Sequence, residues 1–156
     1  HQDVVKECMR IAERVCLRFT LVGSNGVDLV IAPGGRPYAI EVNPRFQGTL
    51  ECLEAALRVN VVKMHADACL HRKLPAEIVQ PTAFCTRLIV YAPERCSTLN
   101  LAHENWLRDV PLPGSLVEKG EPVCSVLARE KTRSQSLRLA RRRASKVLGA
   151  LGAMRK

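Results

Sequence analysis

Residues 26–48 have the sequence GVDLVIAPGGRPYAIEVNPRFQG, which predicts a β-hairpin followed by a loop. The segments 27–31 and 37–42 are rich in aliphatic and β-branched residues, as strands usually are. Between them, residues 32–36 (Ala-Pro-Gly-Gly-Arg) form a strong turn signal. Two antiparallel strands joined by a tight turn are therefore the first element that we expect.

The pairing in this hairpin is expected to bring two acidic side chains together. If Gly34 and Gly35 are the two central residues of the turn, Asp28 lies directly opposite Glu41. Alternate residues of a strand share a face, so Asn43 points the same way as Glu41. Like charges in opposed positions destabilise a sheet, so a shared proton or a cation is expected between them. Apolar neighbours in both strands predict that the site is half-buried.

Two carboxylates and one amide oxygen are hard ligands, of the kind that Mg²⁺ or Mn²⁺ prefers over zinc. We therefore expect Asp28, Glu41 and Asn43 to be metal ligands. Arg45 follows at the exit of the second strand, where its guanidinium could hold a phosphate. The alternative is an exposed hairpin whose acidic residues face solvent, and a one-residue slip of register would separate the two acids.

The ordered set of Asp28, the Glu-Val-Asn of 41–43 and the Pro-Arg of 44–45 resembles the metal-binding end of the ATP-grasp superfamily. Members carry an acidic residue on one strand and a Glu-x-Asn on the next, often followed by Pro-Arg or Thr-Arg. The Phe-Gln-Gly of 46–48 resembles the branch that contains biotin carboxylase and carbamoyl-phosphate synthetase. Direct coverage is about residues 20–72. The region 109–127, with Thr132-Arg133 and a helix, resembles the C-terminal part of predicted prokaryotic ATP-grasp carboligases.

The resemblance implies an ATP- and Mg-dependent ligase that joins a small-molecule carboxylate to an amine or another nucleophile through an acyl phosphate. Asp28 and Glu41 would then ligate metal, with Glu41 bridging two ions, and Asn43 would complete the ligands of the second ion. Arg45 would be catalytic, holding the transferred phosphate or the carboxylate substrate. Glu41, Asn43 and Arg45 would form the cofactor-binding set, and the implied cofactors are ATP and Mg²⁺ (or Mn²⁺).

Only 27 residues precede Asp28, whereas the family covers the ATP phosphates with lysines and a glycine-rich loop from an earlier lobe. Neither a Walker A pattern nor a G-x-G-x-x-G motif occurs in the sequence. We therefore expect this chain to be the C-terminal part of the enzyme, with the N-terminal remainder of the ATP-grasp fold as a partner. The start at His1 fits this expectation, because it has neither an initiator Met nor a signal peptide.

The expected fold class is α+β, with three parts. Residues 1–75 are predicted as the C-terminal lobe of an ATP-grasp domain, with an antiparallel sheet and helices, and residues 76–130 as a small β-rich subdomain. Residues 131–156 are predicted as a basic amphipathic C-terminal helix, begun by a capping box at Thr132 and Gln135. Further helices are predicted over 4–18, 49–58 and 60–71, and further strands over 83–91, 106–110 and 123–127. On the helix over 60–71, His65 and His71 are expected at the surface.

Charge and cysteine content limit the other functions. The net charge is +9, but residues 131–156 hold nine Lys and Arg and no acid, so the rest is about neutral. A basic nucleic-acid-binding domain is one competing hypothesis. The arginines lack interleaved aromatic residues, however, so nucleic acid is not expected as the main partner. A degenerate ATP-grasp-like module without catalytic activity is the second alternative.

No apolar run approaches the roughly 18 residues of a membrane helix, so no membrane association is expected. The seven cysteines include no C-x-x-C pair, which argues against a structural zinc site and a disulfide framework. Reduced thiols in a cytoplasmic protein are expected instead. Association into a homo-oligomer is left open by the sequence.

Overall fold

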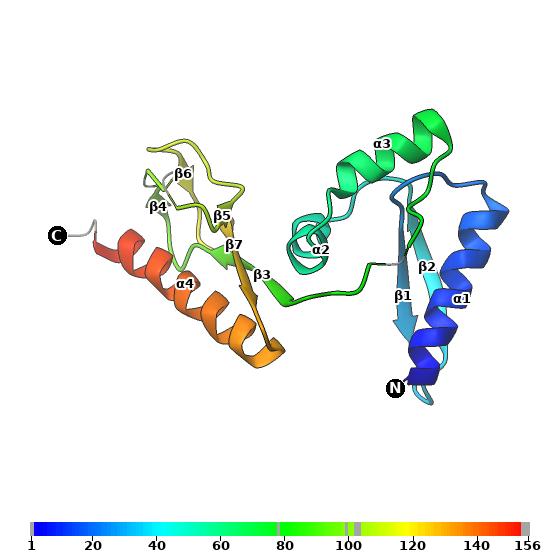
Figure 1. Ribbon diagram of the computed structural model, residues 1–156. Coiled ribbons are helices and arrows are strands. Elements are labelled where there is room, and N and C mark those ends of the chain that lie inside the picture. The colour runs from blue at the N-terminus through cyan, green and yellow to red at the C-terminus, as the bar shows by residue number, and fades with distance from the viewer. Residues whose placement is uncertain (1, 78, 99, 102–103, 154–156) are drawn as a thin grey trace. The chain divides into compact units, whose positions relative to one another are not determined.

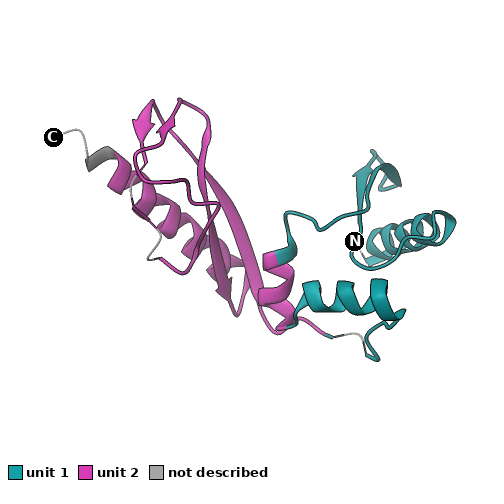
Figure 2. Ribbon diagram, turned by 90° about the horizontal axis from the view of Figure 1, so that it is seen from above, with its two compact units in different colours: residues 1–50, 59–79 teal, residues 51–58, 80–156 magenta. Residues whose placement is uncertain are grey.

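The computed structural model describes residues 2–77, 79–98, 100–101 and 104–153, which form the helices and strands labelled in Figure 1. The chain divides into two compact units, residues 1–50 with 59–79 and residues 51–58 with 80–156 (Figure 2). Four helices and antiparallel sheets confirm the predicted α+β class. None of the described helices is long and apolar enough to cross a membrane.

The first unit is a hairpin flanked by helices. Helix α1 (Gln2–Arg18) packs on the antiparallel pair of β1 (Gly26–Ile31) and β2 (Pro37–Asn43). In β1, Val27 and Leu29 are half-buried whereas Asp28 is exposed, so α1 covers the aliphatic face of the hairpin. The other face of the hairpin, which carries Asp28, is left open by α1.

Helix α3 (Val61–His71) completes the first unit, with the bounds and cap that its sequence predicts. The Asn60 side chain accepts a hydrogen bond from the Lys63 amide at 2.7 Å, as an N-cap residue does. The helix ends at Arg72, whose backbone is left-handed (φ 54°) and whose N–H bonds back to the Ala68 carbonyl.

The second unit is built on a three-stranded antiparallel sheet of β3 (Phe84–Tyr91), β7 (Pro122–Glu130) and β5 (Leu107–Arg108), in the order β3-β7-β5. A separate short pair joins β4 (Cys96–Ser97) to β6 (Leu116–Val117). Helix α2 (Leu50–Leu57) belongs to this unit except for its first residue. The strands β4 and β6 were not predicted, and β5 is shorter than the strand predicted over 106–110.

Helix α4 (Arg133–Ala153) packs along β3 and β7, and small residues allow the close approach. Ala140 is fully buried, as is Ser136, whose hydroxyl donates to the Ala128 carbonyl at 2.8 Å. Thr132 caps the helix as predicted, because its Oγ1 accepts from the Gln135 amide at 3.3 Å. Arg143 donates to the Leu127 carbonyl and stacks over a tryptophan ring, Trp106, with 5.2 Å between Cζ and the ring centroid. The helix therefore shares one core with the sheet.

Two groups of the second unit, the Asp109 carboxyl and the Cys52 thiol, have pKa values shifted by their neighbours. A hydrogen bond from Ser125, and next the Arg87 guanidinium 2.6 Å away, hold the pKa of Asp109 below its usual value. Burial raises the pKa of the Cys52 thiol to about 12, and a hydrogen bond with the thiol of Cys85 adds to the rise. These contacts join α2 to β3, and they join the residue after β5 to β3 and β7. The predicted division at residues 75 and 130 stays a prediction.

Candidate functional site

The hairpin places Asp28 and Glu41 in directly opposed positions on adjacent strands. Toward the open end of the hairpin, Val27 pairs with Val42 and Gly26 pairs with Asn43. Opposed residues of an antiparallel pair point to the same face, and alternation along the strand adds Asn43 to that face. The predicted opposition of the two carboxylates is confirmed.

The turn that produces this pairing differs from the predicted one. The Ala32 amide donates to the Arg36 carbonyl at 2.9 Å, and the Gly35 amide donates to the Ala32 carbonyl at 2.9 Å. The loop therefore has three residues, 33–35, rather than two. Gly34 (φ 91°) and Gly35 (φ 83°) both adopt the left-handed conformation that glycine tolerates without strain. Continued without interruption, this turn would place Ile40 opposite Asp28.

A β-bulge at Ile40 restores the opposition of the acids. Ala39 pairs with Leu29 and Glu41 pairs with Asp28, so Ile40 is the extra residue between two consecutive pairs. Without the register shift, Glu41 would lie opposite Val27 on the face that α1 covers. The prediction was thus right about the pair and wrong about its cause, because the bulge rather than a two-residue turn aligns the acids.

The carboxylates are more accessible than predicted. Asp28 and Glu41 are both exposed, and only Asn43 is half-buried. The prediction of a half-buried pair was wrong because α1 packs on the opposite face of this two-stranded sheet. Asn43 Nδ2 donates to Asp28 Oδ2 across 3.4 Å, a long bond that partly compensates the charge. A half-turn of the amide would present Asn43 Oδ1 to a cation at the same position.

Arg45 lies in the loop that follows β2, and hydrogen bonds within the loop hold its backbone. The Arg45 amide donates to the Asn43 carbonyl at 2.8 Å, and Gln47 Nε2 donates to the Arg45 carbonyl at 2.9 Å. Gln47 lies directly over Gly26, where a Cβ atom would overlap its side-chain amide. The Arg45 side chain is exposed and donates to the Phe46 carbonyl at 3.1 Å. The guanidinium is therefore available at the strand exit, next to the proposed ligands.

A histidine of α3 contacts the loops on both sides of the hairpin. His65 Nδ1 accepts a hydrogen bond from the Ser24 amide at 2.9 Å, just before β1. The same ring lies 4.7 Å from the Phe46 ring, just after β2, with the two planes inclined at 54°. His65 is half-buried, so its predicted surface position was wrong, whereas His71 is exposed as predicted.

The sequence profile of the ATP-grasp domain matches residues 1–49, which hold α1 and the β1–β2 hairpin. Over these residues, about a third of its length, the chain is similar to an ATP-grasp domain. The matched ATP-grasp segment includes Asp28, Glu41, Asn43 and Arg45, the four residues singled out by the sequence.

A relative of this chain is the uncharacterized protein MJ0776 of Methanocaldococcus jannaschii. The two are 33% identical over 116 residues, which make up 74% of this chain and 28% of MJ0776. The chain therefore spans little more than a quarter of the length of that relative.

Solved structures of three enzymes resemble this chain in fold. The N5-carboxyaminoimidazole ribonucleotide synthetase of Thermotoga maritima matches with a TM-score of 0.68 at 16% identity, over 94% of this chain and 42% of the synthetase. The L-amino acid ligase of Bacillus licheniformis matches with a TM-score of 0.60 at 14% identity, over 77% of this chain and 34% of the ligase. A multi-domain long-chain acyl-CoA carboxylase matches with a TM-score of 0.64 at 20% identity, over 95% of this chain and 18% of the carboxylase. At these identities the likeness concerns the fold.

The donor set of the β1–β2 hairpin suits a hard divalent cation. Within the described residues no group of three or more His, Cys, Asp or Glu side chains is placed to hold a metal ion. Asp28, Glu41 and Asn43 instead offer two carboxylates and one amide. Mg²⁺ is often bound by only one or two carboxylates and keeps water and phosphate oxygens as its other ligands. The residues present therefore fit Mg²⁺ together with a nucleotide better than they fit a metal held by protein alone.

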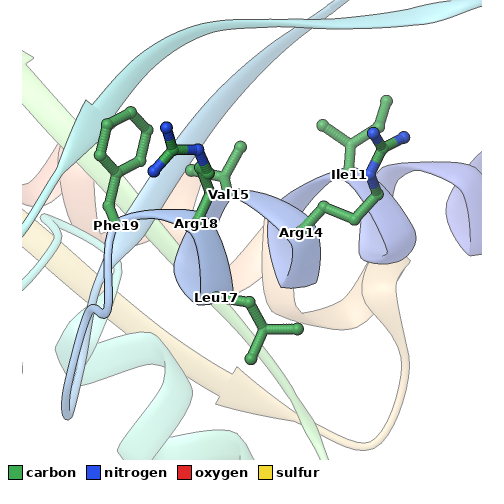
Figure 3. Close-up of a pocket in the computed structure, with 6 residues that line it drawn as sticks. All are labelled: Ile11, Arg14, Val15, Leu17, Arg18 and Phe19. Carbon is green, nitrogen blue, oxygen red and sulfur yellow. The ribbon is translucent and has the colours of Figure 1, made fainter.

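A groove of about 600 Å³ lies at the C-terminal half of helix α1. Its lining includes none of the four candidate site residues Asp28, Glu41, Asn43 and Arg45. Its lining, shown in Figure 3, combines apolar side chains with two arginines and consists of Ile11, Arg14, Val15, Leu17, Arg18 and Phe19. The Phe19 and Leu17 side chains are 63% and 73% exposed. The groove is thus separate from the metal-ligand candidates.

Proposed function

We propose that this chain supplies the metal- and phosphate-binding residues of an ATP-dependent ligase that joins a carboxylate to an amine or another nucleophile. The opposition of Asp28 and Glu41 on the open face of the hairpin is the observation that carries the proposal. A bulge that aligns two like charges works against the stability of the sheet, and a bound cation removes that cost. The names of the three solved enzymes, a synthetase, a ligase and a carboxylase, agree with this class of chemistry.

The proposed roles follow from the donor atoms. Asp28 and Glu41 would bind Mg²⁺ through their carboxylate oxygens, and Asn43 would add its amide oxygen. When bound, Mg²⁺ neutralises the phosphate charges and keeps the phosphates in line for transfer. Arg45, exposed at the exit of β2, would hold the transferred phosphoryl group or the carboxylate substrate through its guanidinium.

The reaction has two steps. A carboxylate oxygen of the substrate attacks the γ-phosphorus of ATP, which forms an acyl phosphate and releases ADP. The nucleophile then attacks the carbonyl carbon, loses a proton and displaces inorganic phosphate. Neither step needs a covalent bond to the protein, so the work of these residues is positioning and charge neutralisation.

The proposed compartment is the cytoplasm. All seven cysteines, Cys8, Cys16, Cys52, Cys69, Cys85, Cys96 and Cys124, are free thiols. Free thiols are typical of proteins in reducing compartments.

Replacement of Glu41 by Gln in the active protein tests the proposal. The variant keeps the shape of the side chain and removes one metal-ligating oxygen and its charge. We expect metal-dependent ATP turnover to fall by a factor of 100 or more, on the order of the effect of removing a key electrostatic group from an active site. ADP release with and without a carboxylate substrate measures it.

A matched control removes a carboxylate elsewhere in the same unit. Glu13 is an exposed acid on α1, and Glu13→Gln should leave turnover unchanged. Full activity in Glu41→Gln would refute the assignment. A wild-type protein that folds and binds Mg-ATP without turning it over would favour the non-catalytic ATP-grasp-like module instead.

A further inference from the structure

The β1–β2 hairpin carries its candidate site at its open end, away from the turn. Asp28 lies four residues after Ser24, and Arg45 lies directly before Phe46. Strand ends and loops are the parts of a structure that open most easily. The bond between Asn43 and Asp28 is 3.4 Å long, so it holds this end only weakly. Beyond these strand ends the backbone pairing of Gly26 with Asn43 stops, so a contact between the two flanking loops would add to it.

We propose that His65 is a positioning residue for the metal site, acting through the two loops that flank the hairpin. Its ring accepts the Ser24 amide hydrogen at 2.9 Å on one side and contacts the Phe46 ring, 4.7 Å away, on the other. One side chain of α3 thus ties the entry of β1 to the exit of β2. The inference rests on the proposed function for its consequence, since the ligands that it positions are those of the proposed metal site.

The surroundings of His65 require an imidazole in one tautomer. Because Nδ1 accepts from the Ser24 amide, the ring proton lies on Nε2, which faces Cys69 Sγ at 3.6 Å. Gly23 allows the close approach of the ring, since a Cβ atom there would overlap Nδ1. Gly23 also has a φ of 76°, a conformation that side chains disfavour. The glycine, the histidine and the phenylalanine therefore form one contact set across three separate segments.

Two substitutions at position 65 separate the acceptor from the ring. His65→Phe keeps a ring beside Phe46 and removes the acceptor of the Ser24 amide hydrogen. His65→Asn does the reverse, because its side-chain oxygen can take the position of Nδ1. His71→Phe is the matched control, since His71 is an exposed histidine of the same helix.

In the active protein, His65→Phe should raise the Mg²⁺ concentration for half-maximal ATP turnover about tenfold, as expected when a part-buried amide loses its partner. Turnover at saturating Mg²⁺ should stay within about twofold of wild type, which marks a loss of metal binding rather than of chemistry. His65→Asn should recover most of the Mg²⁺ affinity, and His71→Phe should behave as wild type. An unchanged Mg²⁺ requirement in His65→Phe would overturn the inference.

Hydrogen–deuterium exchange of residues 20–26 and 43–48 gives a readout that does not depend on activity. His65→Phe should speed exchange in both loops, and Gly23→Ala should do the same from the other side of the contact by displacing the ring. Unchanged exchange in both variants would overturn the inference even if turnover falls. If the two variants exchange faster but the wild-type protein shows no metal-dependent turnover, the proposed function is wrong. The contact of His65 with the two loops would then still be supported.

Discussion

Glu41→Gln is expected to stabilise the metal-free protein slightly and to destabilise the protein in Mg²⁺. Asp28 and Glu41 are directly opposed and both exposed, so their repulsion acts through water. Two unit charges about 5 Å apart in water repel each other by about 0.8 kcal/mol. The amide of Asn43 and dissolved salt reduce this. Removing the Glu41 charge should therefore add about 0.5 kcal/mol to the free energy of unfolding in EDTA.

The sign should reverse when metal is added. A ligand present at 100 times its dissociation constant stabilises the folded state by about 2.7 kcal/mol, and the variant loses that contribution. Urea unfolding in EDTA and in Mg²⁺ with ADP measures both conditions. Glu13→Gln removes an exposed carboxylate of α1, and its free energy of unfolding should match that of the wild type in both conditions. If Glu41→Gln were destabilised equally in EDTA and in Mg²⁺, Glu41 would act as an ordinary structural residue and the metal assignment would be wrong.

Further predictions concern packing, charge and thiol reactivity away from the hairpin. Arg143→Gln should destabilise the protein by about 2 kcal/mol in urea unfolding, because it loses a bond to a backbone carbonyl and its stacking on a tryptophan. The neighbouring Arg142 is exposed, so Arg142→Gln should change stability by less than about 0.5 kcal/mol. The depressed pKa of Asp109 adds stability that is complete above its unfolded pKa and is lost as the pH falls through its folded pKa. The difference in melting temperature between wild type and Asp109→Asn should therefore shrink as the pH is lowered below about 4. Iodoacetamide at pH 8 should label exposed Cys69 well before Cys52, whose raised pKa of about 12 leaves little thiolate.

Local signals predicted the parts of the fold that local interactions decide. Asn60 caps α3 with its side chain, and the helix follows at once, as the sequence indicated. The hairpin and the helix cap at Thr132 likewise depend on residues only a few positions apart. Strands β4 and β6 have two residues each and pair across about twenty positions, so no periodicity marks them. They form because the backbone around Thr98 and Ser115 bonds across the gap.

The candidate site shows the same limit within a single hairpin. The acid pair could be predicted from spacing, but the spacing argument rested on a two-residue turn that the chain does not form. Exposure of the pair depends on which face of the hairpin α1 covers. Since α1 ends ten residues before Asp28, the local spacing of the acids gives no information on this packing. The contact of His65 with Ser24 joins residues 41 positions apart, so only the packed structure reveals it.

The bulge at Ile40 reconciles two demands on β2. Near the turn, Pro37 must point toward α1, and it is buried there, opposite Ile31. Simple alternation from Pro37 would then turn Glu41 and Asn43 toward α1 as well, since both lie an even number of residues further on. One inserted residue reverses the alternation, so Val42 takes the covered side and the polar pair takes the open one. The same short strand thereby packs against a helix in one half and presents carboxylate and amide groups to solvent in the other, as the proposed site for a cation and a nucleotide requires.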